Sequence, residues 1–425
     1  MGATIPAGIL GYQGQVIEEV LTDHDAGMVH ITCRRDARRR PVDPKTGRCG
    51  GINRFKRRTI SDVPLAGYAC AVEIEYAEVY LSPSHVRVEQ LEFVLPKARV
   101  TRRFGRLISG LCRHLPISVV ARHTGLRWDA IKAIDSAHLA EIIEPVRPQD
   151  LMGIRYLGVD EVARAKGQDY FTLVYDLTPG ENCGRILWVH EGKDGAALCK
   201  FLDALSESCA KGIEAIAMDM GPAYISAVQT SLPSAAIVFD RFHVMQLFSK
   251  VIRDCRSAEF KEAKKLGDLT GQEIIKGSLY LLLANRDNLK DTDRSRLERL
   301  LSQNQKLNTL YTLKEQLQQL WNTSSSPKKM AASLEDWCGM AEKAAITGLA
   351  QFVKTLRAHR TGISNYAAHP ITTAKLEAGN VAIGLLRRRA RGFRDMEYFK
   401  LKIFQLNTED TPSFLFTKFS TLSSV

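Results

Sequence analysis

The sequence contains no apolar run long enough to cross a membrane, although it is 425 residues long. A spanning helix needs about 20 mostly apolar residues, so a membrane span is excluded. The first ten residues have neither a basic start nor a sustained apolar stretch, and a secretory signal is therefore not expected. The nine cysteines are odd in number and irregularly spaced. This is not typical of a disulfide framework and favours a reducing cytoplasm.

The composition is that of an ordinary globular protein, with 45% hydrophobic and 25% charged residues. The chain exceeds the length that one hydrophobic core usually serves, which predicts several domains. Lys and Arg number 59 against 47 Asp and Glu, giving a formal net charge of +12. An excess of positive charge favours an anionic partner without identifying it.

The positive charge is concentrated in two stretches. Residues 34–58 hold eleven basic residues against two acids, and a second cluster lies within residues 387–394. Such clusters can be solvated surface, but their like charges repel unless a polyanion neutralises them. Arg outnumbers Lys in both, which suits paired contacts to phosphate. The candidate DNA contacts in these clusters are Arg38, Arg39, Arg40, Arg54, Lys56, Arg57, Arg58, Arg387, Arg388, Arg389 and Arg391.

Two small modules are predicted before residue 150. In the first, apolar Val72 and Ile74 alternate with Glu73 and Glu75, as in a half-buried strand. The pattern then becomes helical from residue 103 to residue 139, with a turn at Gly125. Short helices joined by a glycine turn are typical of a helix-turn-helix. Its candidate DNA contacts are Arg127 and Lys132.

From residue 155 the pattern predicts three strands and then alternating helices and strands. The first three strands favour an antiparallel meander, and residues 195–209 a single helix. The order β-β-β-α-β-α-β-α predicts a mixed sheet with helices on its faces, the ribonuclease-H-like α/β class. Residues 259–356 read as an α-helical insertion. A coiled dimerisation arm is the alternative, but regular heptads are not sustained.

Two acids end apolar strands of this sheet. Taken singly, Asp160 and Asp219 are more typical of helix caps or turns. Strands one and four are neighbours in a ribonuclease-H-like sheet, however, and would bring the two carboxylates together. Paired carboxylates repel unless a divalent cation lies between them, and Mg²⁺ with phosphate ligands indicates phosphoryl transfer. Glu377, in the motif directly ahead of the expected basic helix of residues 381–391, is the candidate third carboxylate.

Four motifs in this order carry a family resemblance: 157–161, 217–220, 237–244 and 376–380, the last followed by 391–394. They resemble DDE insertion-sequence transposases, which join a zinc ribbon and a helix-turn-helix to a ribonuclease-H-like core. The match runs from about Cys33 to Phe404. The resemblance implies that Asp160, Asp219 and Glu377 are catalytic and hold two Mg²⁺ ions, for which Mn²⁺ can substitute. It also implies auxiliary roles for Asp240 and His243, although a capping or core histidine remains an alternative.

The N-terminal module departs from this pattern. Cys33 stands at the first zinc-ligand position, but Asp36 stands where its partner is expected, and residues 80–85 contain no cysteine. Structural zinc usually takes four ligands. We therefore expect no structural zinc, with an irregular site as the alternative.

The resemblance implies a transposase that binds terminal inverted repeats, cleaves the element ends and joins 3′-hydroxyls to target DNA. Its partner would be double-stranded DNA, bound by a homodimer or larger oligomer, with a cytoplasmic, nucleoid-associated location. Two alternatives stay open: a transposase-derived DNA-binding regulator without catalysis, and a structure-specific nuclease. The expected domains are a degenerate zinc-ribbon-like module (1–98), a helix-turn-helix (99–150), a catalytic domain (151–258 and 357–405), a helical insertion (259–356) and a C-terminal tail (406–425).

Overall fold

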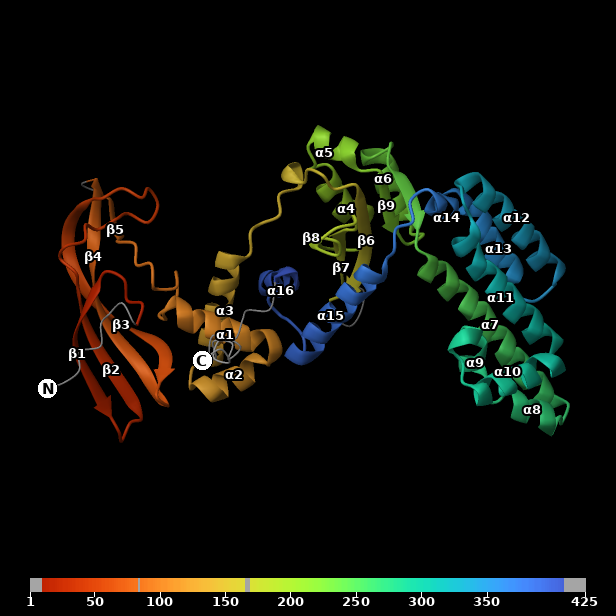
Figure 1. Cartoon of the computed structure of the whole chain (residues 1–425), viewed down its shortest axis with the longest axis horizontal. Helices are drawn as coiled ribbons and strands as arrows, with labels where there is room; N and C mark the ends of the chain where they lie inside the picture. Colours follow the sequence, from red (N-terminus) through yellow and green to blue (C-terminus); the bar gives the residue numbers. More distant parts are fainter. Residues whose placement is uncertain (1–9, 83–84, 165–168, 409–425) are drawn as a thin grey trace, which may run out of the picture. The chain divides into compact units, whose positions relative to one another are not determined.

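The computed structural model describes residues 10–82, 85–164 and 169–408, which leaves most of the expected C-terminal tail outside the described residues (Figure 1). The chain divides into two compact units, each described by itself below. The first comprises Met1–Pro145 and Leu385–Val425, and the second Val146–Gly384. Residues 385–405, assigned above to the catalytic domain, pack with the first unit.

The first unit begins with a five-stranded sheet, as the alternating pattern predicts. The strand order is β1-β2-β4-β3, with β5 on the far end of β4. Val72 and Ile74 of β4 are fully buried, while the intervening glutamates face the other side. The strands are β1 (Gln15–Asp23), β2 (Met28–Arg35), β3 (Gly51–Leu65), β4 (Tyr68–Ser82) and β5 (His85–Val88).

The helix-turn-helix follows as three helices, α1 (Arg102–His114), α2 (Ile117–Thr124) and α3 (Trp128–Ile142). Gly125 ends α2 with a φ of 70°, a left-handed conformation that glycine adopts without strain. Ile108, Val120 and Ile131 form the shared core. The late helix α16 (Met396–Phe404) and the short η4 (Gln405–Asn407) belong to this unit, and α16 packs on α3.

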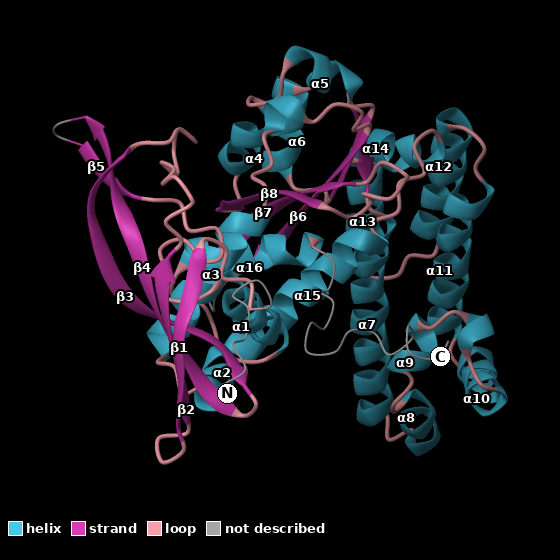
Figure 2. Ribbon diagram, turned by 60° about the vertical axis from the view of Figure 1, so that its left-hand side comes forward, coloured by secondary structure: helices cyan, strands magenta, loops and turns pink. Residues whose placement is uncertain are grey.

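The second unit contains the mixed sheet, in the order β10-β9-β6-β7-β8. Strands β6 (Tyr156–Ala163), β7 (Tyr170–Asp176) and β8 (Ile186–Glu191) form the expected antiparallel meander. Strands β9 (Ala215–Met218) and β10 (Ala236–Phe239) join β6 in parallel, as a ribonuclease-H-like sheet requires. Figure 2 shows this sheet with its covering helices.

One predicted helix is wrong: residues 195–209 form two helices. These are α4 (Gly195–Leu202) and α5 (Glu207–Gly212), and α6 (Pro222–Ser231) follows β9. The break has a local cause, because the Ser206 side chain accepts a hydrogen bond from the backbone of Cys209 and so starts a new helix.

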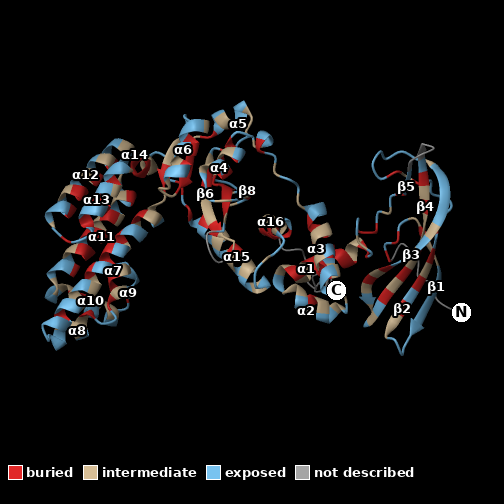
Figure 3. Ribbon diagram, turned by 180° about the vertical axis from the view of Figure 1, so that it is seen from behind, coloured by how far each residue is buried: buried red, intermediate tan, exposed pale blue. Residues whose placement is uncertain are grey.

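The rest of the second unit is helical. Phe248, Trp337 and Phe352 contact one another in its core, so the insertion is a compact bundle (Figure 3). The expected boundary at residue 259 falls inside α7. The helices are η1 (Pro148–Asp150), α7 (Arg241–Lys265), α8 (Leu269–Ile275), α9 (Leu279–Leu283), η2 (Arg286–Asn288), α10 (Asp291–Gln303), α11 (Gln305–Thr323), α12 (Pro327–Lys343), α13 (Leu349–Ala358), α14 (Arg360–Ser364) and η3 (Asn365–Ala367). Helix α15 (Ala374–Ala390) belongs to this unit up to Gly384, and its last residues belong to the first unit.

Candidate active site

Strand register aligns the acids that the sequence singled out. Strand β6 pairs with β9 through Leu157↔Ile216 and Gly158↔Ala217. Asp160 and Asp219 have the same sequence offset as these pairs, so the register aligns them across the two strands. Strand β9 pairs with β10 through Phe239↔Met218, a register that aligns Asp219 with Asp240 in the same way. Asp219 and Asp240 therefore follow the carboxyl ends of β9 and β10, where open α/β sheets place their ligands, and Asp160 is aligned with them inside β6, which continues to Ala163.

Helix α15 lies against this sheet in close contact. A Cβ added to Gly158 of β6 would lie 2.7 Å from a methyl carbon of Leu376, and one added to Gly379 would lie 2.8 Å from the Tyr175 hydroxyl. The neighbouring β6 residues Leu157 and Val159 belong to the core that contains Leu198 of α4. Because strand side chains alternate between faces, α15 covers the face that carries Asp160.

The glycine contact predicts how substitutions on α15 behave. Gly379→Ala is expected to lower the free energy of unfolding by about 1–3 kcal/mol, because the new methyl group overpacks against Tyr175. Gly384→Ala on the same helix is the matched control, since its Cβ would meet nothing within 4 Å. That control should gain about 0.5–1 kcal/mol from helix propensity. Denaturant unfolding measures both, and equal effects would contradict the close packing of α15 on β7.

Asp160 is held by two hydrogen bonds. Its Oδ2 accepts from the Asn380 amide at 2.6 Å, and its Oδ1 accepts from the backbone N–H of Glu161 at 2.7 Å. The Tyr175 hydroxyl donates to the Asn380 Oδ1 at 3.1 Å and so fixes the orientation of that amide. Burial raises the pKa of Asp160, and the charge of Asp219 raises it further, while His243 and the hydrogen bonds oppose the shift.

Glu377 lies in the first turn of α15, one turn before Asn380. Burial raises its pKa, the charges of Asp240 and Asp160 raise it further, and His243 lowers it. Asp240, His243 and Asp160 are therefore near enough to Glu377 for their charges to act on its carboxyl group. The spacing of three residues puts Glu377 and Asn380 on the same face of the helix.

Two of the aspartates also make the local contacts that a turn or cap residue makes. The Asp219 Oδ1 accepts from the backbone of Gly221 at 2.9 Å, and Asp240 caps α7 through the backbone of Phe242 at 2.9 Å. His243 lies in the first turn of α7, edge-on to Phe242. Each acid thus serves the local fold as well as the sheet edge.

The described residues contain no group of three His, Cys, Asp or Glu side chains arranged to hold one metal ion. The chemistry of Asp160 and Asp219 nevertheless fits a divalent cation. Both are carboxylates at one sheet edge, and the charge of Asp219 raises the pKa of Asp160. Such repulsion is relieved when a cation lies between the two groups. Glu377 does not complete a three-ligand group in this arrangement.

Sequence reasoning missed two polar neighbours of the acids. Asn380 belongs to the motif that contains Glu377, and its helical spacing from Glu377 was the available signal. Glu161 is half-buried beside Asp160, and burial followed by the charge of Asp219 raises its pKa. No periodicity or spacing marked Glu161, because it appears as the fifth residue of an ordinary strand motif.

Several basic residues of the N-terminal cluster pair with acids of their own sheet. Arg54 and Lys56 both contact Glu78, and Arg57 contacts Glu75 across the β3–β4 pair. Arg58 is half-buried, with its guanidinium 5.2 Å from the centre of the Tyr76 ring. The remaining predicted DNA contacts of this cluster, Arg38, Arg39 and Arg40, are exposed. Of these, Arg38 pairs with Asp36.

The predicted contacts of the helix-turn-helix lie at the start of α3. Arg127 precedes the helix and pairs with Asp129, and both side chains are exposed. Lys132 makes an ion pair of 2.6 Å with Asp395 of the segment before α16. Between them, Trp128 is 53% exposed, an unusual position for the largest apolar side chain, and sequence reasoning did not select it.

The second basic cluster begins in the last turn of α15 with Arg387, Arg388 and Arg389 and belongs to the first unit. Arg389 donates to the backbone carbonyl of Arg113 at the end of α1. Arg391 adopts a left-handed conformation with a φ of 57°, followed by Gly392 with a φ of 101°. The backbone N–H of Gly392 donates to the Arg387 carbonyl, and the backbone N–H of Arg391 donates to the Arg388 carbonyl. This is a Schellman motif in which Arg391 occupies the left-handed position where glycine is usual.

The cysteine expected to begin a zinc site is buried in the N-terminal sheet. Cys33 has no exposed surface, and burial raises the pKa of its thiol to about 12. Cys49 is exposed, in the loop before β3. Part of the second expected ligand pair, residues 83–84, lies outside the described residues. The expectation of no structural zinc stays a prediction.

A helix-turn-helix and a ribonuclease-H-like sheet edged with aspartates together define a transposase of the DDE class. Two family models match the chain: a transposase domain of the ISL3 group over residues 157–403 and the helix-turn-helix domain of transposase family ISL3 over residues 89–139. The chain belongs to the ISL3 family of transposases. Membership in a DDE family implies use of a divalent metal. Within the described residues, no helix has the length and apolarity that a membrane crossing requires.

Two named relatives extend this comparison. The chain is 32% identical over 396 residues to the transposase for insertion sequence element IS1001 of Bordetella parapertussis, covering 92% of this chain and 95% of the relative. It is 26% identical over 288 residues to the transposase for IS1557 of Mycobacterium tuberculosis (strain CDC 1551 / Oshkosh), covering 63% of each.

Proposed function

We propose that this protein binds the terminal inverted repeats of an insertion sequence, cleaves DNA at the element ends and joins the 3′-hydroxyls to target DNA. The observation that carries the proposal is the strand register that aligns Asp160 with Asp219 in a chain that also carries a helix-turn-helix. A sheet edge with paired carboxylates suits phosphoryl transfer, because phosphodiester cleavage needs stabilisation of negative charge at the attacking and leaving oxygens.

In this proposal Asp160, Asp219 and Glu377 hold two Mg²⁺ ions, or Mn²⁺ in their place. When bound, such ions activate the attacking oxygen and stabilise the leaving oxygen. Asn380 holds the Asp160 carboxylate in one orientation through the 2.6 Å hydrogen bond, and Tyr175 holds Asn380. Glu377 must move closer to the aspartates to become a ligand, and Asp240 and His243, whose charges act on it, position it.

The DNA contacts are proposed to come from the first unit. Exposed candidates are Arg38, Arg39 and Arg40 in the N-terminal module, Arg127 at the start of α3, Arg388 in the last turn of α15, and Arg391 just after that helix. Arg54, Lys56, Arg57, Arg58, Lys132, Arg387 and Arg389 complete the set, with part of their charge already balanced or engaged within the chain. Because two element ends must be bound together, we expect at least a homodimer. The proposed location is cytoplasmic and nucleoid-associated.

The left-handed Arg391 provides a prediction about this surface. Arg391→Gly should raise the free energy of unfolding by about 1 kcal/mol, because glycine removes the backbone strain. DNA affinity should fall, and the slope of log affinity against log salt should decrease by about one. Arg391→Lys is the control and should retain the salt slope. Unchanged DNA affinity in Arg391→Gly would show that a strained arginine here serves no DNA contact.

The test of the function uses the full chain and a DNA fragment that carries the ends of its own element. Incubation with Mg²⁺ should give cleavage at the ends and, with a target plasmid, strand-transfer products. Binding without cleavage in Mg²⁺ or Mn²⁺ would instead support a DNA-binding regulator. Cleavage without any joined product would support a structure-specific nuclease.

A further inference from the structure

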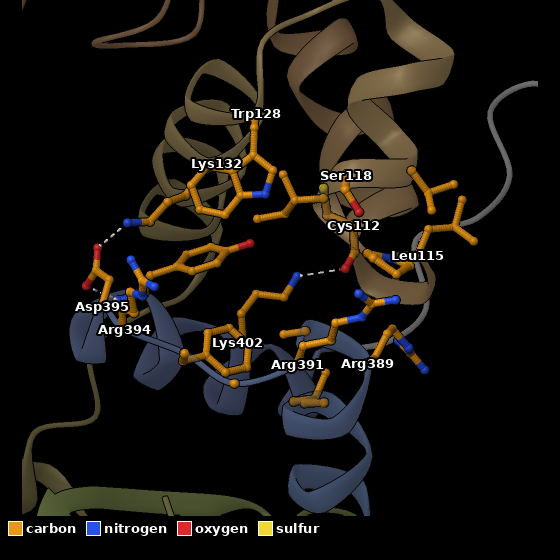
Figure 4. A pocket seen from close by; sticks show the side chains of 18 of the residues that line it. Cys112, Leu115, Ser118, Trp128, Lys132, Arg389, Arg391, Arg394, Asp395 and Lys402 are labelled. Atoms are coloured by element: carbon orange, nitrogen blue, oxygen red, sulfur yellow. Dashed lines mark hydrogen bonds and ion pairs between the residues drawn. The ribbon is translucent and has the colours of Figure 1, made fainter. Parts of the chain in front are cut away.

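A cavity of about 900 Å³ lies within the first unit, between the helix-turn-helix and the segment around α16 (Figure 4). One wall comes from the end of α1, the start of α2 and the start of α3. The other comes from the end of α15, the turn at residues 391–395 and α16. The candidate active site lies in the other unit, and none of its residues lines this cavity.

The aromatic residues of the cavity are held in a fixed arrangement, except for one. Phe393 stacks on Phe399 with ring centres 4.2 Å apart, and the Tyr398 hydroxyl donates to the buried Asp135. Lys402, which is 3% exposed, bonds the same Asp135 at 3.1 Å and so anchors α16 to the helix-turn-helix. Trp128 makes no aromatic contact of this kind within the described residues, and half of its surface is exposed beside the cavity.

The charge around the cavity is strongly positive. Six cationic side chains line it against a single acid, Asp395. Lys132 is balanced by Asp395 and Lys402 by Asp135, and Arg389 contacts a backbone carbonyl. The three remaining cations, Arg122, Arg391 and Arg394, have no ion-pair partner in residues 10–82, 85–164 or 169–408. We therefore expect a ligand of this cavity to combine an apolar, planar group that can stack on Trp128 with negative charge that can contact the three arginines.

The cavity also opens where a helix-turn-helix approaches DNA. The N-terminal residues of α2 and α3 line it, and in this motif the start of the recognition helix enters the groove while the preceding helix meets the backbone. A base within an intact duplex cannot enter a cavity, because both of its faces are stacked on neighbouring bases. An unstacked base can enter and exchange its stacking partner for an aromatic side chain.

We propose that this cavity takes one unstacked nucleobase of bound DNA, which stacks on Trp128. The phosphates on either side of that base contact Arg122, Arg391 and Arg394. This inference rests on the proposed function, because it deepens the DNA recognition of the same unit, but it does not depend on cleavage. The anchored segment around α16 supplies the second wall, so the helix-turn-helix alone would lack the site.

The test compares two duplexes that differ in one position. Both contain 2-aminopurine, paired with thymine in one duplex and unpaired as a single-base bulge in the other. The full-length protein should bind the bulged duplex about tenfold more tightly, which corresponds to stacking of one base. Its Trp128 should also quench the fluorescence of the bulged base. Trp128→Ala should lose both the preference and the quenching, whereas Trp128→Phe should keep most of the preference.

A matched control is Tyr280→Ala, which removes an aromatic side chain that is 67% exposed on α9 of the other unit. It should retain the preference and the quenching. Equal affinity of the wild type for the two duplexes would overturn the proposal, as would an equal loss for both duplexes in Trp128→Ala. An apolar segment of the chain itself is the rival occupant. If Phe414→Ser with Phe416→Ser, outside the described residues, strengthened binding to both duplexes equally, that segment and not a base would occupy the cavity.

The outcomes separate this inference from the proposed function. A protein that cleaves element ends but has no preference for the bulged duplex would contradict only the cavity. A protein that prefers the bulge through Trp128 but never cleaves DNA would contradict only the transposase chemistry.

Discussion

Asp160→Asn, Asp219→Asn and Glu377→Gln are each expected to reduce cleavage of element ends by about 10³-fold or more, while DNA binding stays unchanged. Each replacement removes one negative charge and keeps the shape of the side chain. The loss therefore tests charge at the sheet edge and not packing. Gel-shift binding and end cleavage, measured on the same protein samples, give the two readouts.

The control for these variants is Asp254→Asn, an exposed carboxylate on α7 away from the sheet edge. It should cleave at the wild-type rate. Full cleavage activity in any of the three active-site variants would remove that residue from the proposed mechanism. The cleavage rate of Asn380→Ala should lie between those of the wild type and the three active-site variants, because this substitution frees the Asp160 carboxylate without removing its charge.

The pH dependence of cleavage follows from the same residues. Burial, together with the charge of Asp219, raises the pKa of Asp160, and burial raises that of Glu377. Both groups must lose their protons to hold a cation, so activity should decline on acidification at a higher pH than ordinary carboxylates would give. The unfolding free energy changes with pH in the opposite direction. The folded state holds these protons more tightly, and the unfolding free energy should fall as pH rises between the unfolded and folded pKa values.

Asp62→Ala is expected to lower the unfolding free energy of the first unit by about 2–5 kcal/mol, because it leaves the buried hydroxyls of Tyr12 and Thr101 without their hydrogen-bond acceptor. The Asp62 side chain is fully buried on β3 and receives hydrogen bonds from Tyr12, Thr101 and Arg103. Thr101 also caps α1, so the network ties the N-terminal sheet to the helix-turn-helix. Denaturant unfolding followed by a signal from this unit measures the loss.

Asp129→Ala is the control for this prediction, because its ion pair with Arg127 is exposed on both sides. Exposed pairs contribute at most about 1 kcal/mol, so a small change is expected. Burial alone would raise the pKa of Asp62, but the hydrogen bonds from Arg103, Thr101 and Tyr12 lower it. Its contribution should thus be present above the unfolded pKa and lost as pH falls through the folded value. A loss in Asp62→Ala no larger than in Asp129→Ala would contradict the network.

The elements of the fold were largely predictable because their patterns are local. Alternation in β4, the Gly125 turn and the apolar strand ending before Asp219 depend on residues close together in the sequence, and the structure confirms them. The expected strand end at Asp160 is wrong, because β6 continues to Ala163 through its pairing with β7. The break between α4 and α5 was not predictable from apolar spacing, because it depends on the Ser206 cap within a continuous helical pattern. The packing of residues 387–394 with the first unit could not be predicted for a different reason. It accompanies the packing of α16 on α3, which is a contact between segments far apart in the sequence.

The candidate site divides in the same way. The proximity of Asp160 and Asp219 could be predicted, because the order of the sheet makes their strands neighbours, and the observed register aligns the two residues. Asn380, Tyr175 and Glu161 could not be ranked, since their importance depends on side-chain contacts across the sheet. Trp128 was missed because an aromatic residue at the start of a helix normally belongs to the core.

The nine cysteines, all within the described residues, differ sharply in accessibility. Cys49 is the exposed one, and burial raises the thiol pKa of Cys33, Cys70, Cys112, Cys255 and Cys338. Thiolates are the reactive form, so a maleimide dye at neutral pH should attach first at Cys49. That position lies between residues 38–40 and β3, in the loop that joins β2 to β3. A dye there would test the proposed contact of DNA with the N-terminal module in the native sequence, without any engineered labelling site.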